Sequence, residues 1–216
     1  MSDFTTKQKL DDEINRLCAL YNKGDIETVL SQVSELLDHF SDSAALYIIE
    51  GDANAKLQRF HSAIKSYRKA IYLIPGFALP HFNLGVVYQD KGDLDSAIKS
   101  YQNALAIESE DPKIYNNLGL IYRDKDELRS AVKCFEKVIQ LNPRIAEVYN
   151  NLGVINLKLK SYNLATDNFR RAVELKSDFF SSLYNLGVTI QETQGVSFSL
   201  PYFKKAINLD PDSAII

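Results

Sequence analysis

A short motif, asparagine–leucine–glycine, recurs along this chain at a fixed spacing of 34 residues. Its four copies are Asn83-Leu84-Gly85, Asn117-Leu118-Gly119, Asn151-Leu152-Gly153 and Asn185-Leu186-Gly187. A period of this length is typical of repeat arrays, in which each unit packs only on its neighbours. The motif therefore predicts a stack of similar units rather than a chain folded around one central core.

The same period can be laid over most of the chain without an insertion. It gives six windows, 10–43, 44–77, 78–111, 112–145, 146–179 and 180–213, of which 10–43 fits only in a degenerate form. Residues 1–9 are polar, and we expect them to be a frayed lead-in. Residues 214–216 stand where a seventh unit would start, or form a tail.

Small and large residues alternate within each window at helical spacing. Position 8 is glycine in five of the six windows, although glycine costs a helix about 1 kcal/mol relative to alanine. Position 20 is small, as in Ala131, and position 24 is aromatic in five windows, as in Phe135. This pattern predicts two antiparallel helices per window, with the glycine meeting the small residue of the partner helix.

Prolines and glycines mark the expected ends of the helices. Asp111 precedes Pro112, which is typical of a helix N-cap followed by proline in the first turn. Gly92 stands between the two helices of its window, where a left-handed conformation ends the first helix. In the last window, Pro201 would interrupt an established helix. We therefore expect that helix to start late, after a long and mobile connection over residues 195–199.

With these positions assigned, the chain resembles the tetratricopeptide repeat family. The resemblance rests on the recurrent motif, on Tyr88 or Tyr122 three residues after its glycine, and on the alanine, aromatic, alanine and proline that follow. It implies an all-α fold, a right-handed superhelical solenoid of six stacked antiparallel helix pairs. The first helix of each pair would line a concave groove. In window 10–43, Glu13, Arg16 and Leu17 depart from the family pattern, as the residues of a capping unit do.

Window 44–77 departs from the family at two positions that lie one helical turn apart. Glu50 and Asn54 stand where leucine and tyrosine are usual. They indicate either a polar pocket between the first two units, or a partly exposed pair whose hydrogen bonds are made by neighbours or water.

In this family, positions 2, 5, 6, 9, 12 and 13 of each window face the groove. Position 6 is asparagine in five windows here, and an amide can pair with both the N–H and the C=O groups of an extended peptide. The row of amides is similar to the groove of the tetratricopeptide segment of O-GlcNAc transferases, which holds peptide backbones in this way. The candidate peptide-binding residues are Asn83, Asn117, Asn151, Asn185, Asn116, Asn150, Leu120, Arg123, Val154 and Lys158. The alternative for each asparagine is a structural role, in which it steadies the neighbouring helix.

Composition and motifs argue against several other functions. The net charge of −3 and the isoelectric point near 5.7 do not give the basic face that nucleic acid requires. No apolar run approaches the roughly 20 residues that span a bilayer, and the N-terminus lacks the apolar core of a signal peptide, so we expect a cytoplasmic protein. No catalytic motif or metal-ligand spacing occurs, and Cys18 and Cys134 are far apart. We predict neither an enzyme nor a cofactor site within these 216 residues.

The sequence as a whole predicts a scaffold that binds proteins or peptides in its concave groove. The chaperone-binding members of the family clamp a carboxylate with a lysine at position 5, and no window has lysine there. One alternative function is the substrate-recruiting arm of a larger transferase or hydroxylase whose catalytic domain follows Ile216. Another is a structural array that associates with itself through residues 180–216. The identity of the partner does not follow from the sequence.

Overall fold

The computed structural model describes the backbone of residues 2–210 and the side chains of residues 8–210. The chain divides into two compact units, residues 1–109 and 110–216. Unit 1 contains α1 (Ser2–Lys23), α2 (Ile26–His39), α3 (Ala44–Lys56), α4 (Phe60–Leu73), α5 (Ala78–Asp90) and α6 (Leu94–Ile107). Unit 2 contains α7 (Pro112–Asp124), α8 (Leu128–Leu141), α9 (Ala146–Lys158), α10 (Tyr162–Leu175), α11 (Phe180–Gln194) and α12 (Val196–Leu209). The described residues include no strand.

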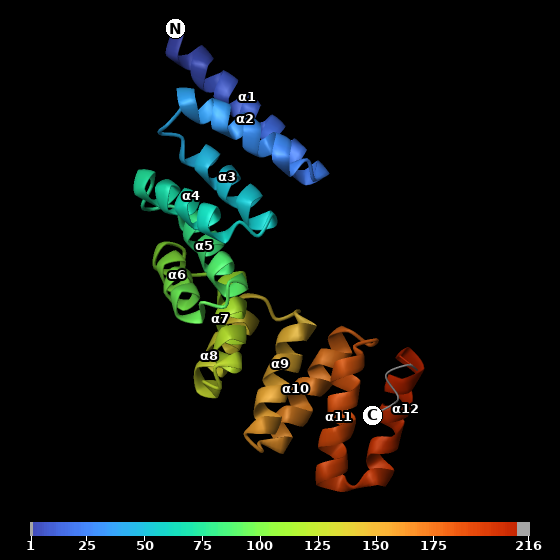
Figure 1. Cartoon of the computed structure of the whole chain (residues 1–216). Coiled ribbons are helices and arrows are strands. Elements are labelled where there is room, and N and C mark those ends of the chain that lie inside the picture. Colours follow the sequence, from blue (N-terminus) through green and yellow to red (C-terminus); the bar gives the residue numbers. More distant parts are fainter. Residues whose placement is uncertain (1, 211–216) are drawn as a thin grey trace. The chain divides into compact units, whose positions relative to one another are not determined.

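Successive helices pack as antiparallel pairs within each unit (Figure 1). Helices α3, α5, α7, α9 and α11 begin at Ala44, Ala78, Pro112, Ala146 and Phe180, the first residues of their windows. The predicted all-α fold of consecutive helix pairs is therefore confirmed. Residues 2–9, expected to be frayed, instead belong to α1, because no glycine or proline interrupts the sequence before Gly24.

The glycine at position 8 makes room for the aromatic ring at position 24 of the same window. A Cβ atom added to Gly119 would lie 2.7 Å from Cε1 of Phe135, and the ring is fully buried. The same relation between glycine and ring holds for Gly51, Gly85, Gly153 and Gly187. The sequence prediction was wrong about the partner, because the ring, and not the small residue at position 20, comes nearest to the glycine.

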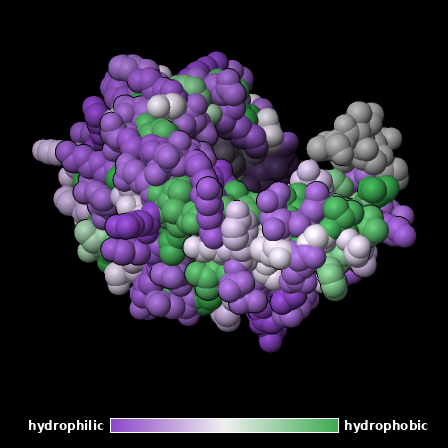
Figure 2. All heavy atoms as spheres, turned by 90° about the horizontal axis from the view of Figure 1, so that it is seen from below, coloured by the Kyte–Doolittle hydropathy of each residue, from purple (hydrophilic) through white to green (hydrophobic). Residues whose placement is uncertain are grey.

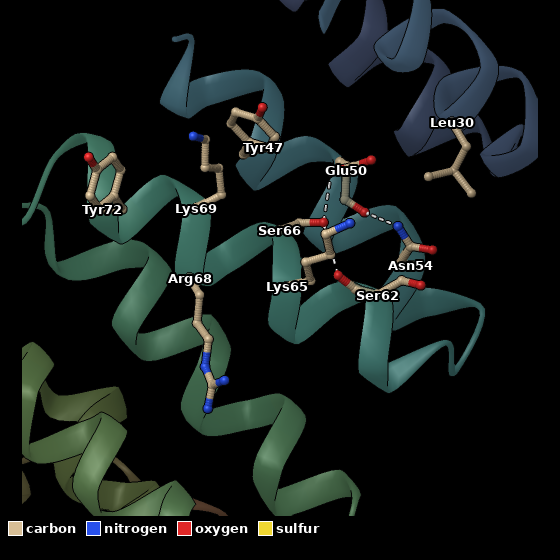
Figure 3. A pocket seen from close by; sticks show the side chains of 10 residues that line it. All are labelled: Leu30, Tyr47, Glu50, Asn54, Ser62, Lys65, Ser66, Arg68, Lys69 and Tyr72. Carbon is tan, nitrogen blue, oxygen red and sulfur yellow. Dashed lines mark hydrogen bonds between the residues drawn. The ribbon is translucent and has the colours of Figure 1, made fainter. Parts of the chain in front are cut away.

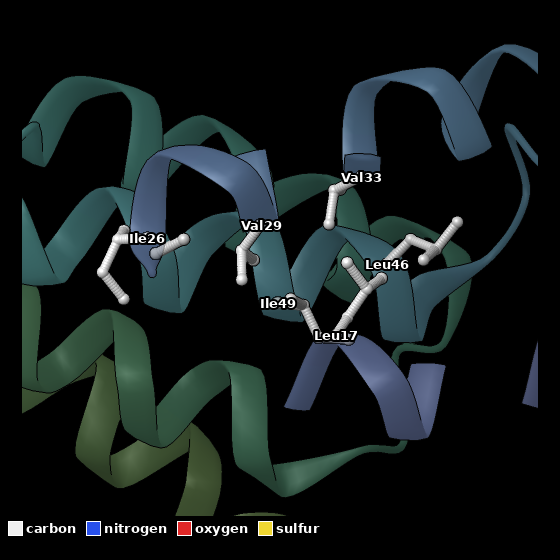
Figure 4. Packing of buried hydrophobic residues seen from close by; sticks show 7 residues of the cluster. Leu17, Ile26, Val29, Val33, Leu46 and Ile49 are labelled. Carbon is white, nitrogen blue, oxygen red and sulfur yellow. The ribbon is translucent and has the colours of Figure 1, made fainter. Parts of the chain in front are cut away.

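The degenerate first window meets the same packing requirement with the sizes exchanged. Leu17 replaces the glycine at position 8, Val33 replaces the aromatic residue at position 24, and both side chains are fully buried. They belong to one cluster with Ile26, Val29 and residues of α3 (Figure 4). Because a larger residue at one position offsets a smaller one at the other, this window forms a helix pair despite its weak match to the repeat.

Five of the six turns within the helix pairs use a residue at position 15 with a positive φ angle. These residues are Gly24 (85°), Gln58 (56°), Gly92 (83°), Asp126 (61°) and Lys160 (58°). A single left-handed residue ends the first helix and reverses the chain. Glycine occupies only two of these positions, so a glycine search alone misses the other turns.

The last helix pair differs from the sequence prediction. Helix α11 has 15 residues where α3, α5, α7 and α9 have 13, and Gly195 alone, with a φ of 98°, separates it from α12. The predicted long connection over residues 195–199 and the late helix start are therefore wrong. Pro201 lies inside α12 and cannot donate to the carbonyl of Ser197, but both residues are exposed, so water can reach that carbonyl.

On the face drawn in Figure 2, hydrophobic residues form small groups within a mostly hydrophilic surface. Among residues 2–210, no helix combines the length and the apolar character needed to span a bilayer. The predicted start of a seventh unit at residues 214–216 lies outside the described residues.

Candidate binding surfaces

The asparagines at position 6 of unit 2 occupy equivalent places on α7, α9 and α11, and all are half-buried. Nη1 of Arg123 donates to Oδ1 of Asn151 at 3.2 Å, which links two successive repeats. Because arginine only donates, this bond fixes the orientation of the amide and leaves its NH2 group available. Within the described part of the chain, neither that NH2 group nor the side chain of Asn185 has a hydrogen-bond partner. Asn117 does have an interaction partner.

The other candidate residues of unit 2 differ in their burial and in the bonds that they form. Oδ1 of Asn150 accepts a hydrogen bond from Oγ of Ser182 at 2.9 Å, and Asn116 is half-buried. Leu120 packs partly against the core of unit 2, while Val154 is exposed. Lys158 forms an exposed ion pair with Asp126 of the preceding repeat, a type of contact that contributes little to stability.

In unit 1, Asn83 reaches back to the preceding repeat. Its Nδ2 donates to Oδ1 of Asp52 at 2.9 Å, and the same oxygen accepts a hydrogen bond from the hydroxyl of Tyr67 at 2.6 Å. The structural interpretation of Asn83 and Asn151 is thus supported, because each bonds to a neighbouring repeat. Each amide also retains hydrogen-bonding capacity that these contacts do not use.

Two adjoining pockets of unit 1, of about 440 and 280 Å³, share Tyr21 and Asp52. Most of their lining comes from α1, α3 and α5, at positions 5, 6, 9, 12 and 13 of the windows. The lining residues at those positions are Cys18, Tyr21, Asn22, Ile49, Asp52, Ala55, Lys56, Phe82, Asn83, Val86 and Asp90. The groove positions of three successive windows therefore border one continuous recessed surface.

Asp52 is the central charged residue of this recessed surface, and the sequence analysis missed it. Burial raises the pKa of its carboxyl group above the ordinary value, against the opposing effect of the hydrogen bonds from Tyr67 and Asn83. Burial, followed by the charge of Asp52, also raises the pKa of the Tyr67 hydroxyl. A signal was present, because Asp52 is the only charged residue at position 9 of any window.

A third pocket of about 880 Å³ lies between α2, α3 and α4 of unit 1 (Figure 3). Oγ of Ser66 donates to Oε2 of Glu50, and Nδ2 of Asn54 donates to the backbone oxygen of Glu50, both at 2.8 Å. Both interpretations of Glu50 and Asn54 therefore apply. Neighbouring residues make hydrogen bonds with the pair, and both side chains also line a pocket. Lys65, Arg68 and Lys69 border the same pocket.

Within the described residues, no group of three or more histidine, cysteine, aspartate or glutamate side chains is arranged to hold a metal ion. Both cysteines are free thiols. Burial raises the pKa of Cys134 to about 11, so its thiol is protonated at neutral pH.

Family models place this chain among known repeat proteins. Two models described as the tetratricopeptide repeat match residues 112–145 and 146–179, and a model described as TPR repeat matches residues 51–92 and 90–126. Together these matches cover more than half of the chain. The chain belongs to the tetratricopeptide repeat family. The matches at 112–145 and 146–179 have the same bounds as two windows of the sequence analysis.

Solved structures of other proteins share the tetratricopeptide fold of this chain. A crystal structure of MamA is 23% identical, with a TM-score of 0.73, and covers 79% of this chain and 93% of its own. YrrB is 21% identical, with a TM-score of 0.73 and coverage of 84% and 94%. The C-terminal part of a TPR repeat-containing protein from Cytophaga hutchinsonii is 18% identical, with a TM-score of 0.80 and coverage of 93% and 80%. No curated protein sequence matches this tetratricopeptide chain.

Proposed function

We propose that this chain is a protein-interaction module that holds an extended peptide segment against the first helices of its repeats. The observation that carries the proposal is the recessed surface of unit 1, where residues at the groove positions of three successive windows line two adjoining pockets. Clefts that combine apolar walls with a few polar groups are the usual form of a binding site. YrrB, which shares the fold, is described as a TPR protein with an unusual peptide-binding site.

In unit 2, the asparagines supply the polar part of the proposed contact. The free NH2 group of Asn151 would donate to a peptide carbonyl, and the amide of Asn185 would both donate and accept. Val154, about one helical turn after Asn151 on α9, is exposed and would contact a peptide side chain. Each amide-to-backbone hydrogen bond contributes about 0.5–1.5 kcal/mol net, so affinity would come from several such bonds together.

The test is a triple variant, Asn117→Ala, Asn151→Ala and Asn185→Ala, measured against peptides selected by phage display of random dodecamers on the unchanged protein. Among the selected peptides, we consider one that binds to unit 2. We expect its dissociation constant to rise about tenfold or more in the triple variant, because two or three net hydrogen bonds are lost. Fluorescence anisotropy gives the affinity, and circular dichroism gives the melting temperature of each variant.

A matched control is Asn208→Ala, which removes an exposed amide from the second helix of a pair. This control should leave both affinity and melting temperature unchanged. If the triple variant binds the selected peptide as tightly as the parent but melts at a lower temperature, the asparagines are structural and the proposed contact is wrong.

Self-association through residues 180–216 is a second candidate, favoured by the exposed side of α12. Among the described residues, Val196, Phe198 and Leu200 are 58%, 62% and 46% exposed, and Ile207 and Leu209 are exposed as well. Val196, Leu200 and Ile207 recur at helical spacing and share one face of α12, and an exposed apolar face of this kind is typical of interfaces. Sedimentation velocity over a concentration series should show a dimer that Leu200→Ser weakens, whereas a monomer at every concentration would exclude this candidate.

A further inference from the structure

The carboxylate of Asp52 is held by one oxygen only. Oδ1 accepts two hydrogen bonds, from the Tyr67 hydroxyl and from Nδ2 of Asn83, and Oδ2 has no partner in the described part of the chain. No completely buried side-chain oxygen or nitrogen among residues 8–210 lacks a partner, so Oδ2 must reach solvent. Asp52 lines both pockets of the recessed surface, so this free oxygen belongs to the wall of the proposed binding site.

The charge of Asp52 is not neutralised inside the protein. Among the described residues, no lysine, arginine or histidine forms an ion pair with it, although burial has removed much of its water. Lys56, one turn further along α3, lies instead over the ring of Tyr21, with Nζ 4.9 Å from the ring centroid. A partly desolvated carboxylate without a cation gains free energy when a ligand supplies one.

The surroundings of Asp52 suit an extended cationic side chain. Tyr21 and Phe82 present aromatic rings to the pocket of about 440 Å³, and Val86 adds an apolar surface. The methylene stem of a lysine or arginine can pack on such surfaces while its charged end reaches a carboxylate. Asp90 provides a second carboxylate in the same pocket, so two acids face the single cation Lys56. This balance disfavours an anionic occupant.

We propose that the pocket around Asp52 binds a lysine or arginine side chain of the peptide, with its ammonium or guanidinium group paired to Oδ2 of Asp52. This inference rests on the proposed peptide-binding function, to which it adds a requirement for a basic residue at one point of the bound segment. The stem of that residue lies between Tyr21 and Phe82. Lys56 acts against binding, because it places a like charge at the edge of the pocket.

The raised pKa of Asp52 gives the pocket a pH dependence of known sign. A bound cation stabilises the ionised carboxylate, so binding strengthens as the pH rises through the pKa of Asp52 and releases a proton there. The other titratable groups of this pocket are Tyr21, Lys56, Tyr67 and Asp90.

The key variant is Asp52→Asn, because an asparagine in the same place can still accept from Tyr67 and from Asn83 through Oδ1. It removes the charge and keeps the shape. The probes are three libraries of dodecapeptides that are identical except for the central residue, fixed as lysine, glutamine or glutamate. For the unchanged protein we expect the lysine library to be retained about tenfold or more above the glutamine library, and the glutamate library least.

Two further variants make the test specific. Asp52→Asn should abolish the preference for lysine, whereas Lys56→Gln should increase it, so two residues one turn apart have opposite effects. Asp42→Asn removes the same charge from the connection between α2 and α3 and should leave the preference unchanged. Equal retention of the lysine and glutamine libraries, or a preference that survives Asp52→Asn, overturns the cation site while peptide binding stands. If the unchanged protein retains none of the libraries, the proposed function fails together with this inference.

Discussion

The substitution Gly119→Leu is expected to lower the free energy of unfolding of unit 2 by about 3 kcal/mol, at the upper end of the usual cost of overpacking. Even a Cβ atom at this position would lie 2.7 Å from Cε1 of Phe135. The ring is fully buried against neighbouring side chains, so it has no free space to move into. The gain in helix propensity over glycine, about 1 kcal/mol, is too small to offset this overlap.

A compensating variant separates overlap at the ring from any other effect of leucine. The first window already combines Leu17 at position 8 with Val33 at position 24 in a packed cluster. The double variant Gly119→Leu with Phe135→Val copies that combination into unit 2. We expect its loss of stability to be smaller than the sum of the two single losses by about 1–3 kcal/mol, the range observed for residues in contact.

Hydrogen exchange of the α7 and α8 amides is the suitable measurement, because a repeat array need not unfold in one step. The amides of α12 in the same sample serve as an internal reference, since that helix lies at the other end of unit 2. Losses that simply add in the double variant would show that glycine and ring are not coupled, which would contradict the packing assigned to positions 8 and 24.

The helix pairs were predictable because each is specified several times over by the sequence. Glycine at position 8 and an aromatic residue at position 24 recur together in five windows. The N-cap at Asp111 also forms as its sequence suggests, with Oδ1 accepting a hydrogen bond from the backbone N–H of Lys113 at 2.7 Å. Periodic patterns of this kind depend on local geometry and on packing between neighbouring repeats. For that reason, a single exception such as Leu17 does not prevent its window from forming a helix pair.

The recessed surface around Asp52 was not predictable in the same way. Its defining hydrogen bond joins Asn83 to a residue 31 positions earlier in the chain, which depends on how one repeat is offset against the next. A comparison of equivalent positions in the windows reveals the row of asparagines, because those residues share position 6. The same comparison does not predict the contact between Asn83 and Asp52, because these residues stand at different positions of different windows.

The structure expected for the last window was wrong because the cost of a proline in a helix does not by itself decide where the helix starts. Proline inside a helix costs about 3 kcal/mol, which suggested a late helix start at Pro201. The chain instead continues α11 to Gln194 and turns at Gly195, where glycine tolerates the positive φ. The packing of α12 against α11 therefore outweighs the cost of the proline.

We expect Pro201→Ala to stabilise α12 by about 2 kcal/mol. Alanine restores the backbone hydrogen bond to Ser197 and removes the ring clash, a gain of about 3 kcal/mol in a helix interior. The loss of the proline's restriction on the unfolded chain returns up to about 1 kcal/mol of this gain. Little packing is lost, because Pro201 is exposed.

The measurement is amide hydrogen exchange in α12, where 2 kcal/mol corresponds to a slowing of about 30-fold for amides that exchange by local opening. Ser197→Ala is the matched control, because it changes an exposed residue of the same turn without altering the backbone, and its effect should stay within about 0.5 kcal/mol. Unchanged or faster exchange in Pro201→Ala would mean that the proline costs α12 nothing where it stands. In that case α12 continues through Pro201 because the proline has no cost at this exposed position, and not because the packing of α11 against α12 offsets one.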